Sequence, residues 1–276
     1  MIIKEYQRLA YASGEGGLRD GMALSLWLKA YADRNRDDIA DLIVAYVSGA
    51  TITDCLDSVE KDSPSDVEEL LDWFLEELRK FPVDELFERV RGVQYALRES
   101  VENVPQLSSF DGSTLNIVDL LSISDTPLTY VRIGYQLYAS DNARNETAKR
   151  KYGENAAKFA ALLDLVRLGH DIKDPSASNR VAVELTKIGK AVARAKGDRQ
   201  EIVARLLLRL ALFRDLIGSD DPVYESRFSG VVSLLGEQTR KRRASAFSAM
   251  LHMYKTYGGT IPECSRAEEL LWKMRH

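Results

Sequence analysis

A short β-branched strand that passes directly into a helix constrains this chain more than any other feature. The stretch VAVELTKIGKAVARA, residues 181–195, has strand-forming residues at 181–185 and helix-forming residues from 187 onward. Thr186 stands between them and can cap the helix, because its hydroxyl can accept a hydrogen bond from a free backbone N–H group of the first turn. The chain must therefore place a strand and a helix side by side with almost no loop between them.

Helical patterns precede this strand. The sequence predicts a helix over 128–139, a short basic helix over 142–153 that ends at Gly153, and a third helix over 154–169 that ends at Gly169. A polar loop, with room for a short strand at its start, is expected over 170–180.

Three helices, a strand, a loop, a returning strand and an immediate helix resemble the winged helix-turn-helix superfamily. The segments LLDLVRLG (162–169) and VAVELTKIGKAV (181–192) carry the resemblance, which covers about residues 125–196. It implies that Leu185 and Ile188 lie in the core, and that Gly189 allows close approach to the wing. The tail of the chain is similar, more distantly, to winged modules of bacterial restriction and phage-defence proteins, in which an Arg-Arg pair opens a final helix.

The resemblance implies a DNA-binding surface. In a winged helix, the third helix enters the major groove and the wing touches the minor groove or the backbone. The candidate residues are polar or basic and lie on that helix, before it, or beside the wing: Asn155, Lys158, Arg150, Lys151, Lys173 and Arg180. The alternative is a module that binds protein, because the alanines at 156, 157, 160 and 161 leave the third helix few polar groups.

The first hundred residues have a different character. Helical patterns over 18–34, 37–49, 63–81 and 83–104 predict an acidic helical bundle at 1–104. Residues 105–127 contain prolines, glycine and many serines and are the expected linker, although LNIVDLL within them is apolar enough to pack on a domain. The predicted fold class is therefore mostly α, with a winged-helix domain and a helical C-terminal extension at 128–276.

Charge divides at the same place. Residues 1–127 have a net charge of −13 and residues 128–276 a net charge of +9. The basic half is suited to polyanions such as duplex DNA, whereas the acidic half is suited to protein contact. The densest basic run of the basic half is Arg240, Lys241, Arg242 and Arg243, in the second of two helices expected over 221–259. Cations at a helix start oppose the helix dipole, which suggests that an anion compensates them.

No catalytic set is evident in the sequence. His170, His252 and His276 are scattered, and neither a phosphate-binding loop nor a metal-binding spacing is present, so we expect no enzyme, no cofactor and no metal. The stretch HDIKD (170–174) contains the Asp-x-Lys of nuclease signatures but lacks a preceding carboxylate on a strand. Two cysteines form no disulfide framework, which favours a reducing cytoplasm, and no apolar run approaches the roughly 20 residues that span a bilayer.

These observations predict a non-enzymatic protein that binds duplex DNA through its C-terminal half and a partner protein through its acidic half. Such a protein would serve as an accessory or regulator, in one version within a prokaryotic antiviral defence system. The alternative is a structural subunit of a multiprotein complex, in which the winged helix contacts protein. The apolar helix expected over 198–217 could pack on the winged unit or form a homodimer surface.

Overall fold

The chain forms two compact units that are mostly α-helical. The computed structural model describes residues 36–49, 64–91, 114–138, 145–170, 181–259 and 264–276. The units are Met1–Phe81 and Pro82–His276. Their net charges are −8 and +4, so the charge asymmetry seen in the sequence persists at this boundary.

The described part of the first unit consists of helices α3 (Arg36–Val47) and α5 (Pro64–Lys80), in agreement with two of the predicted helices. The ring of Tyr46 meets that of Phe74 edge to face, with 5.3 Å between centroids. Both side chains are buried, so this aromatic pair ties α3 to α5. The helix predicted over 18–34 lies outside the described residues.

The second unit begins earlier than the predicted linker at 105–127. Its first helix, α6 (Val83–Arg91), occupies the described part of the helix predicted over 83–104. Within the predicted linker, α7 (Asn116–Ser122) buries Ile117 and Val118 completely. It packs against α8 and α10 and is therefore part of a core, because the apolar LNIVDLL segment supplies a buried face.

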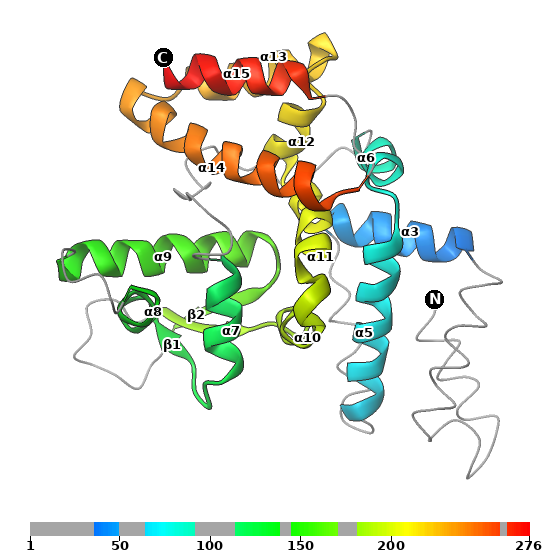
Figure 1. Cartoon of the computed structure of the whole chain (residues 1–276), viewed down its shortest axis with the longest axis vertical. Coiled ribbons are helices and arrows are strands. Elements are labelled where there is room, and N and C mark those ends of the chain that lie inside the picture. Colours follow the sequence, from blue (N-terminus) through cyan, green and yellow to red (C-terminus); the bar gives the residue numbers. More distant parts are fainter. Residues whose placement is uncertain (1–35, 50–63, 92–113, 139–144, 171–180, 260–263) are drawn as a thin grey trace. The chain divides into compact units, whose positions relative to one another are not determined.

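A small sheet with helices around it follows α7 (Figure 1). The strands pair antiparallel in the order β1-β3-β2, with Leu128 opposite Val183 and Val166 opposite Leu185. In chain order the elements are β1 (Leu128–Thr129), α8 (Tyr130–Leu137), α9 (Glu146–Leu162), β2 (Val166–His170), β3 (Val181–Leu185) and α10 (Lys187–Ala195).

Two of the predicted helix ends are wrong. The segments 142–153 and 154–169 were expected to be separate helices, but α9 runs unbroken through Gly153, and Gly169 lies in β2. Gly153 serves packing: a β-carbon there would lie 2.1 Å from the Tyr130 carbonyl oxygen. A β-carbon at Gly134 would likewise lie 1.9 Å from the Lys149 carbonyl oxygen. The two glycines let the backbones of α8 and α9 touch.

The junction between β3 and α10 agrees with the prediction in most respects. The Thr186 hydroxyl accepts a hydrogen bond from the Gly189 amide at 2.8 Å and donates one to the Asp164 carbonyl at 2.5 Å. Ile188 is completely buried, and a β-carbon at Gly189 would lie 1.9 Å from the Leu165 carbonyl oxygen. Gly189 is thus required where α10 passes the start of β2.

Leu185 does not lie in the core as expected. It is half-buried at the end of β3 and lines a surface pocket, whereas Val183 is the fully buried residue of that strand. The strand ends where α10 begins, so no further layer covers Leu185. The hydrophobic anchors of the junction are therefore Val183 and Ile188.

This difference predicts unequal effects of two truncations on stability. We expect Ile188→Ala to lower the free energy of unfolding by about 2–5 kcal/mol, as is usual for a fully buried aliphatic side chain. Leu185→Ala should cost less than about 2 kcal/mol, because part of its surface already meets water. Chemical denaturation of both variants measures the difference, and equal losses would show that Leu185 is a core residue after all.

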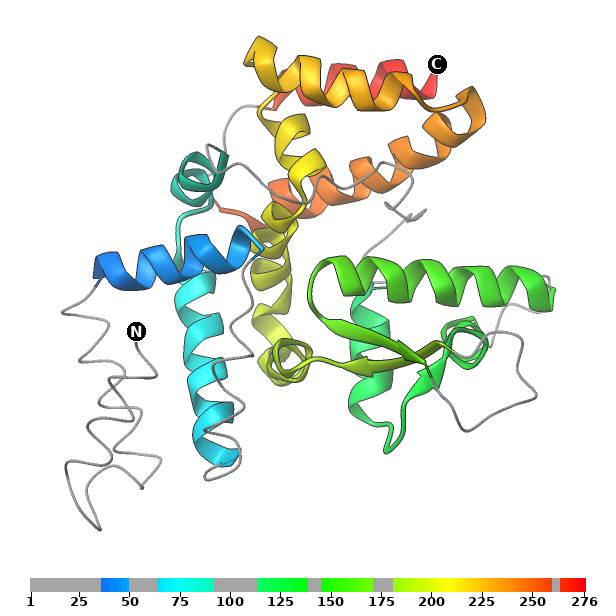
Figure 2. The ribbon, with the colours of Figure 1, turned by 180° about the vertical axis from the view of Figure 1, so that it is seen from behind.

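The remaining helices form a separate layer of the second unit (Figure 2). α14 packs against α11 and α15, and α12 packs against α13. The single helix predicted over 198–217 is in fact two, because the chain is extended at Leu210, with ψ of 107°. The bounds are α11 (Arg199–Leu206), α12 (Ala211–Ile217), α13 (Pro222–Ser233), α14 (Glu237–Tyr257) and α15 (Ser265–Arg275).

The C-terminal end of helix α6 is held by hydrogen bonds from α12 and α13. Arg214 of α12 donates a hydrogen bond from Nη1 to the Val90 carbonyl at 3.2 Å, and the Tyr224 hydroxyl donates one to the Arg91 carbonyl at 3.0 Å. Burial lowers the pKa of Arg214 to about 9. These bonds satisfy carbonyl groups at the end of α6 and explain why the second unit includes it.

Candidate nucleic-acid interface

Helix α9 is the helix that the predicted interface would use to enter a DNA groove. Asn145 caps its start, accepting a hydrogen bond from the Ala148 amide at 2.9 Å. Ala156, Ala157 and Ala160 are buried and face the core. Three of the four alanines that appeared to weaken the reading surface therefore do not belong to it.

The solvent-facing side of α9 carries a shared ion pair. Lys151 and Lys158 are exposed, and both contact Glu154, with Nζ–oxygen distances of 3.0 and 2.6 Å. Partial burial raises the pKa of Glu154, but the hydrogen bonds and charges of Lys158 and Lys151 outweigh this, so that the pKa lies below its usual value. The three side chains, which we call the α9 triad, thus have one net positive charge at neutral pH.

The other two predicted residues of this region are less accessible. Arg150 and Asn155 are half-buried on the flanks of α9. Lys149, which is not among the residues predicted to contact DNA, is only 9% exposed. Its ammonium lies 5.4 Å from the centroid of the Tyr135 ring on α8, a cation–π contact that adds to the α8–α9 crossing. Lys149 lies nine residues before Lys158, about two and a half helical turns, so the two lysines face opposite sides of α9. This spacing could have revealed the inward position only if 142–153 and 154–169 had been predicted as one helix.

The hairpin after α9 corresponds to the predicted wing. Arg167 of β2 and Glu184 of β3 lie opposite each other and form an ion pair at 2.6 Å. Lys173 and Arg180, the predicted wing contacts, lie outside the described residues.

The second basic cluster lies on another layer of the unit. Lys241 pairs with Glu237 at 2.7 Å, and Arg242 is exposed with no ion pair to another described residue. Arg240 and Arg243 are half-buried, and the Nε atom of each is enclosed. Helix α14 packs on α11 and α15, whereas α9 packs on α8 and β2. The basic residues of α9 and those of α14 therefore lie on different layers of the second unit.

The potential metal ligands of the described residues do not form a metal site. No group of three or more metal-binding side chains comes together in the part of the chain that the structure describes. His252 is exposed on α14, and His276 stacks on Trp272 with 4.5 Å between centroids. None of the helices described here has the length and apolar content needed to cross a membrane.

Comparison with known proteins adds no relative. No protein-family model matches the chain, and no curated protein or solved structure is significantly similar to it.

Proposed function

We propose that this is a non-enzymatic protein that binds duplex DNA, and that α7–α10 with β1–β3 act as a winged helix. The observation that carries the proposal is the order α7-β1-α8-α9-β2-β3, with an antiparallel β1-β3-β2 sheet and α8 crossed closely by α9. In such an arrangement the second helix of the crossed pair enters the major groove, and the hairpin reaches the adjacent groove or backbone.

Electrostatics supports the same role. The second unit is cationic overall, and α9 offers two exposed lysines that lie about two turns apart on one helix face. Lysines supply phosphate contacts that position a protein on DNA, and Asn155 could contribute a base contact. Arg242 on α14 would add sequence-independent phosphate contacts. Glu237 at the start of the same helix already compensates Lys241.

The acidic first unit would bind a protein rather than DNA. Its net charge of −8 repels phosphate, and screening reduces but does not reverse that repulsion. We place this protein in the cytoplasm as an accessory or regulator, with antiviral defence as one setting. The α9 triad favours one other candidate, a structural subunit that binds protein through the winged helix, because Glu154 halves the combined charge of Lys151 and Lys158.

The triad makes a specific prediction about affinity. Glu154→Gln removes the carboxylate that both lysines contact, while its amide keeps a similar shape. We expect the full-length variant to bind a short duplex several-fold more tightly than the parent. In the parent, Lys151 and Lys158 must give up their ion pairs with Glu154 to contact phosphates, whereas in the variant they do not. Fluorescence anisotropy with a labelled duplex, repeated over a range of salt concentrations, measures the change.

Glu76→Gln is the matched control. Glu76 also contacts two cations three and four residues away, Arg79 at 2.8 Å and Lys80 at 3.2 Å, although both follow it in the chain. It lies on α5 of the acidic unit. This substitution should leave DNA binding nearly unchanged. An equal gain in DNA affinity in both variants would reveal a general charge effect. If no form of the protein shows salt-sensitive DNA binding, the structural-subunit alternative is favoured. The full chain is used because α7 belongs to the same core as α10.

A further inference from the structure

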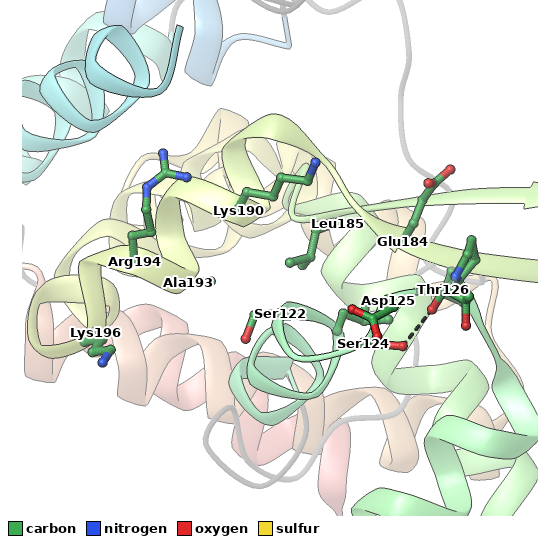
Figure 3. A pocket seen from close by; sticks show the side chains of 13 residues that line it. Ser122, Ser124, Asp125, Thr126, Glu184, Leu185, Lys190, Ala193, Arg194 and Lys196 are labelled. Atoms are coloured by element: carbon green, nitrogen blue, oxygen red, sulfur yellow. Dashed lines mark hydrogen bonds between the residues drawn. The ribbon is translucent and has the colours of Figure 1, made fainter. Parts of the chain in front are cut away.

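A pocket of about 530 Å³ lies on the second unit, between the end of α7 and helix α10 (Figure 3). One wall is the turn from α7 to β1, with Ser124 and Asp125. The other wall is α10, with Lys190 and Arg194. The volume falls in the range of roughly 300–1,000 Å³ that is usual for small-molecule sites. None of these four side chains belongs to the predicted DNA surface.

The α10 wall of the pocket is cationic. Lys190 and Arg194 are one helical turn apart and extend from the same side of α10, and Lys196 follows just after the helix (Figure 3). No ion pair connects Lys190 or Lys196 to any other residue that the structure describes. Lys196 also has a φ of 36°, a backbone conformation that side-chain-bearing residues rarely adopt.

The carboxylates of the pocket do not cancel this charge. Glu184 is engaged by Arg167 of the neighbouring strand at 2.6 Å. Asp125, by contrast, has no ion-pair partner among the described residues, and it stands against two lysines of the pocket, Lys190 and Lys196. The local balance therefore remains positive.

The remaining lining is apolar. Val183 is fully buried beneath the pocket, Leu121 is 6% exposed, and Leu185 presents part of its side chain to solvent. A partly exposed leucine beside Lys190 (Figure 3) suits a ligand with an apolar body and an acidic group better than it suits a bare inorganic ion.

We propose that this pocket binds a small amphipathic organic anion, whose acidic group pairs with Lys190 and Arg194 and whose apolar body covers Leu185. Carboxylate, sulfonate and phosphate groups share the required chemistry, because each offers oxygens to an ammonium and a guanidinium at once. The proposal does not depend on DNA binding by α9. The competing use of the same cations is contact with the phosphates of duplex DNA.

The naphthalene sulfonate dye ANS is a suitable probe, since it combines an anionic group with an apolar ring system and fluoresces when removed from water. We expect saturable binding of one dye per full-length chain. Lys190→Gln combined with Arg194→Gln should weaken that binding about tenfold, because two charge contacts are lost. The uncharged analogue N-phenyl-1-naphthylamine should be affected much less, since it has no acidic group. Circular dichroism checks that the variant remains folded.

The matched control is Lys241→Gln combined with Arg242→Gln, which removes one lysine and one arginine from exposed positions of α14. It should bind the dye like the parent. Absence of saturable dye binding, or equal weakening by both double variants, would overturn the proposal. So would displacement of the dye by duplex DNA together with weaker DNA binding by the Lys190/Arg194 variant, since those cations would then belong to the DNA surface.

Discussion

Gly153→Ala is expected to lower the free energy of unfolding of the second unit by about 3 kcal/mol or more. The new β-carbon would lie 2.1 Å from the Tyr130 carbonyl oxygen and 2.7 Å from the Gly134 amide nitrogen. Both are backbone atoms, so no side chain can rotate away, and α8 must separate from α9. Buried residues of the sheet and of α7 pack around this crossing, so the loss should spread through the core.

Gly230→Ala supplies the control for this prediction. Gly230 also lies inside a helix, α13, but nothing lies within 4 Å of the position its β-carbon would take. Alanine should therefore stabilise α13 by about 0.5–1 kcal/mol, through its higher helix propensity. Urea denaturation should shift in opposite directions for the two variants. Similar shifts would mean that α8 and α9 do not touch at Gly153.

Reversal of both lysines of the α9 triad should produce the largest change in DNA affinity. In Lys151→Glu combined with Lys158→Glu, three carboxylates would line the helix face proposed to enter the groove. We expect at least tenfold weaker binding at moderate salt. The slope of log K against log salt should also fall by up to about 1.8, if each lysine neutralises one phosphate.

Lys255→Glu combined with Lys273→Glu is the charge-matched control. These lysines are exposed and paired with Glu268 and Glu269, at 2.5 and 2.7 Å, on helices remote in sequence from α9. The net charge changes equally, so a loss of binding confined to the α9 variant assigns the contact to α9. Neutralising Arg242 and Arg243 should instead weaken binding to all sequences alike. If neither α9 nor α14 variants alter binding, duplex DNA is not the partner of these surfaces.

Local sequence chemistry predicted the β3–α10 junction correctly, because its determinants are adjacent in the chain. Thr186 can be recognised as a cap from its position between a strand pattern and a helix pattern, and the buried Ile188 follows from it. Leu185 was misplaced because its burial depends on whether another element covers the end of β3, which the strand pattern does not encode.

The glycines of α9 and β2 show why helix ends were harder. A glycine that ends a helix and a glycine that permits close packing look the same in sequence. Gly153 was interpreted as a stop, whereas the contact that requires it comes from Gly134 and Tyr130 on another helix. The turn after α9 is made by Asp164 in a left-handed conformation, with φ of 61°, where sequence reasoning looked for glycine.

The candidate interface was predictable only in its composition. The basic residues of α9 and α14 could be listed from the sequence, but Glu154 was not recognised as the common partner of Lys151 and Lys158, although their spacings of three and four residues permit it. The inward position of Lys149 was missed because a helix end was predicted at Gly153, whereas in the continuous helix α9 the buried Ala156 lies seven residues, about two turns, after it. The cationic pocket required α7 and α10 to be brought together in space.

The Thr186 hydroxyl has a consequence for how this region opens. One oxygen accepts from the start of α10 and donates to Asp164, at the turn that leads into β2. Strand β3 lies between these two points and is paired with β2 along its length. Local unfolding of either end would break bonds at the other, so the turn, the hairpin and the first turn of α10 should exchange their amide hydrogens as one cooperative unit.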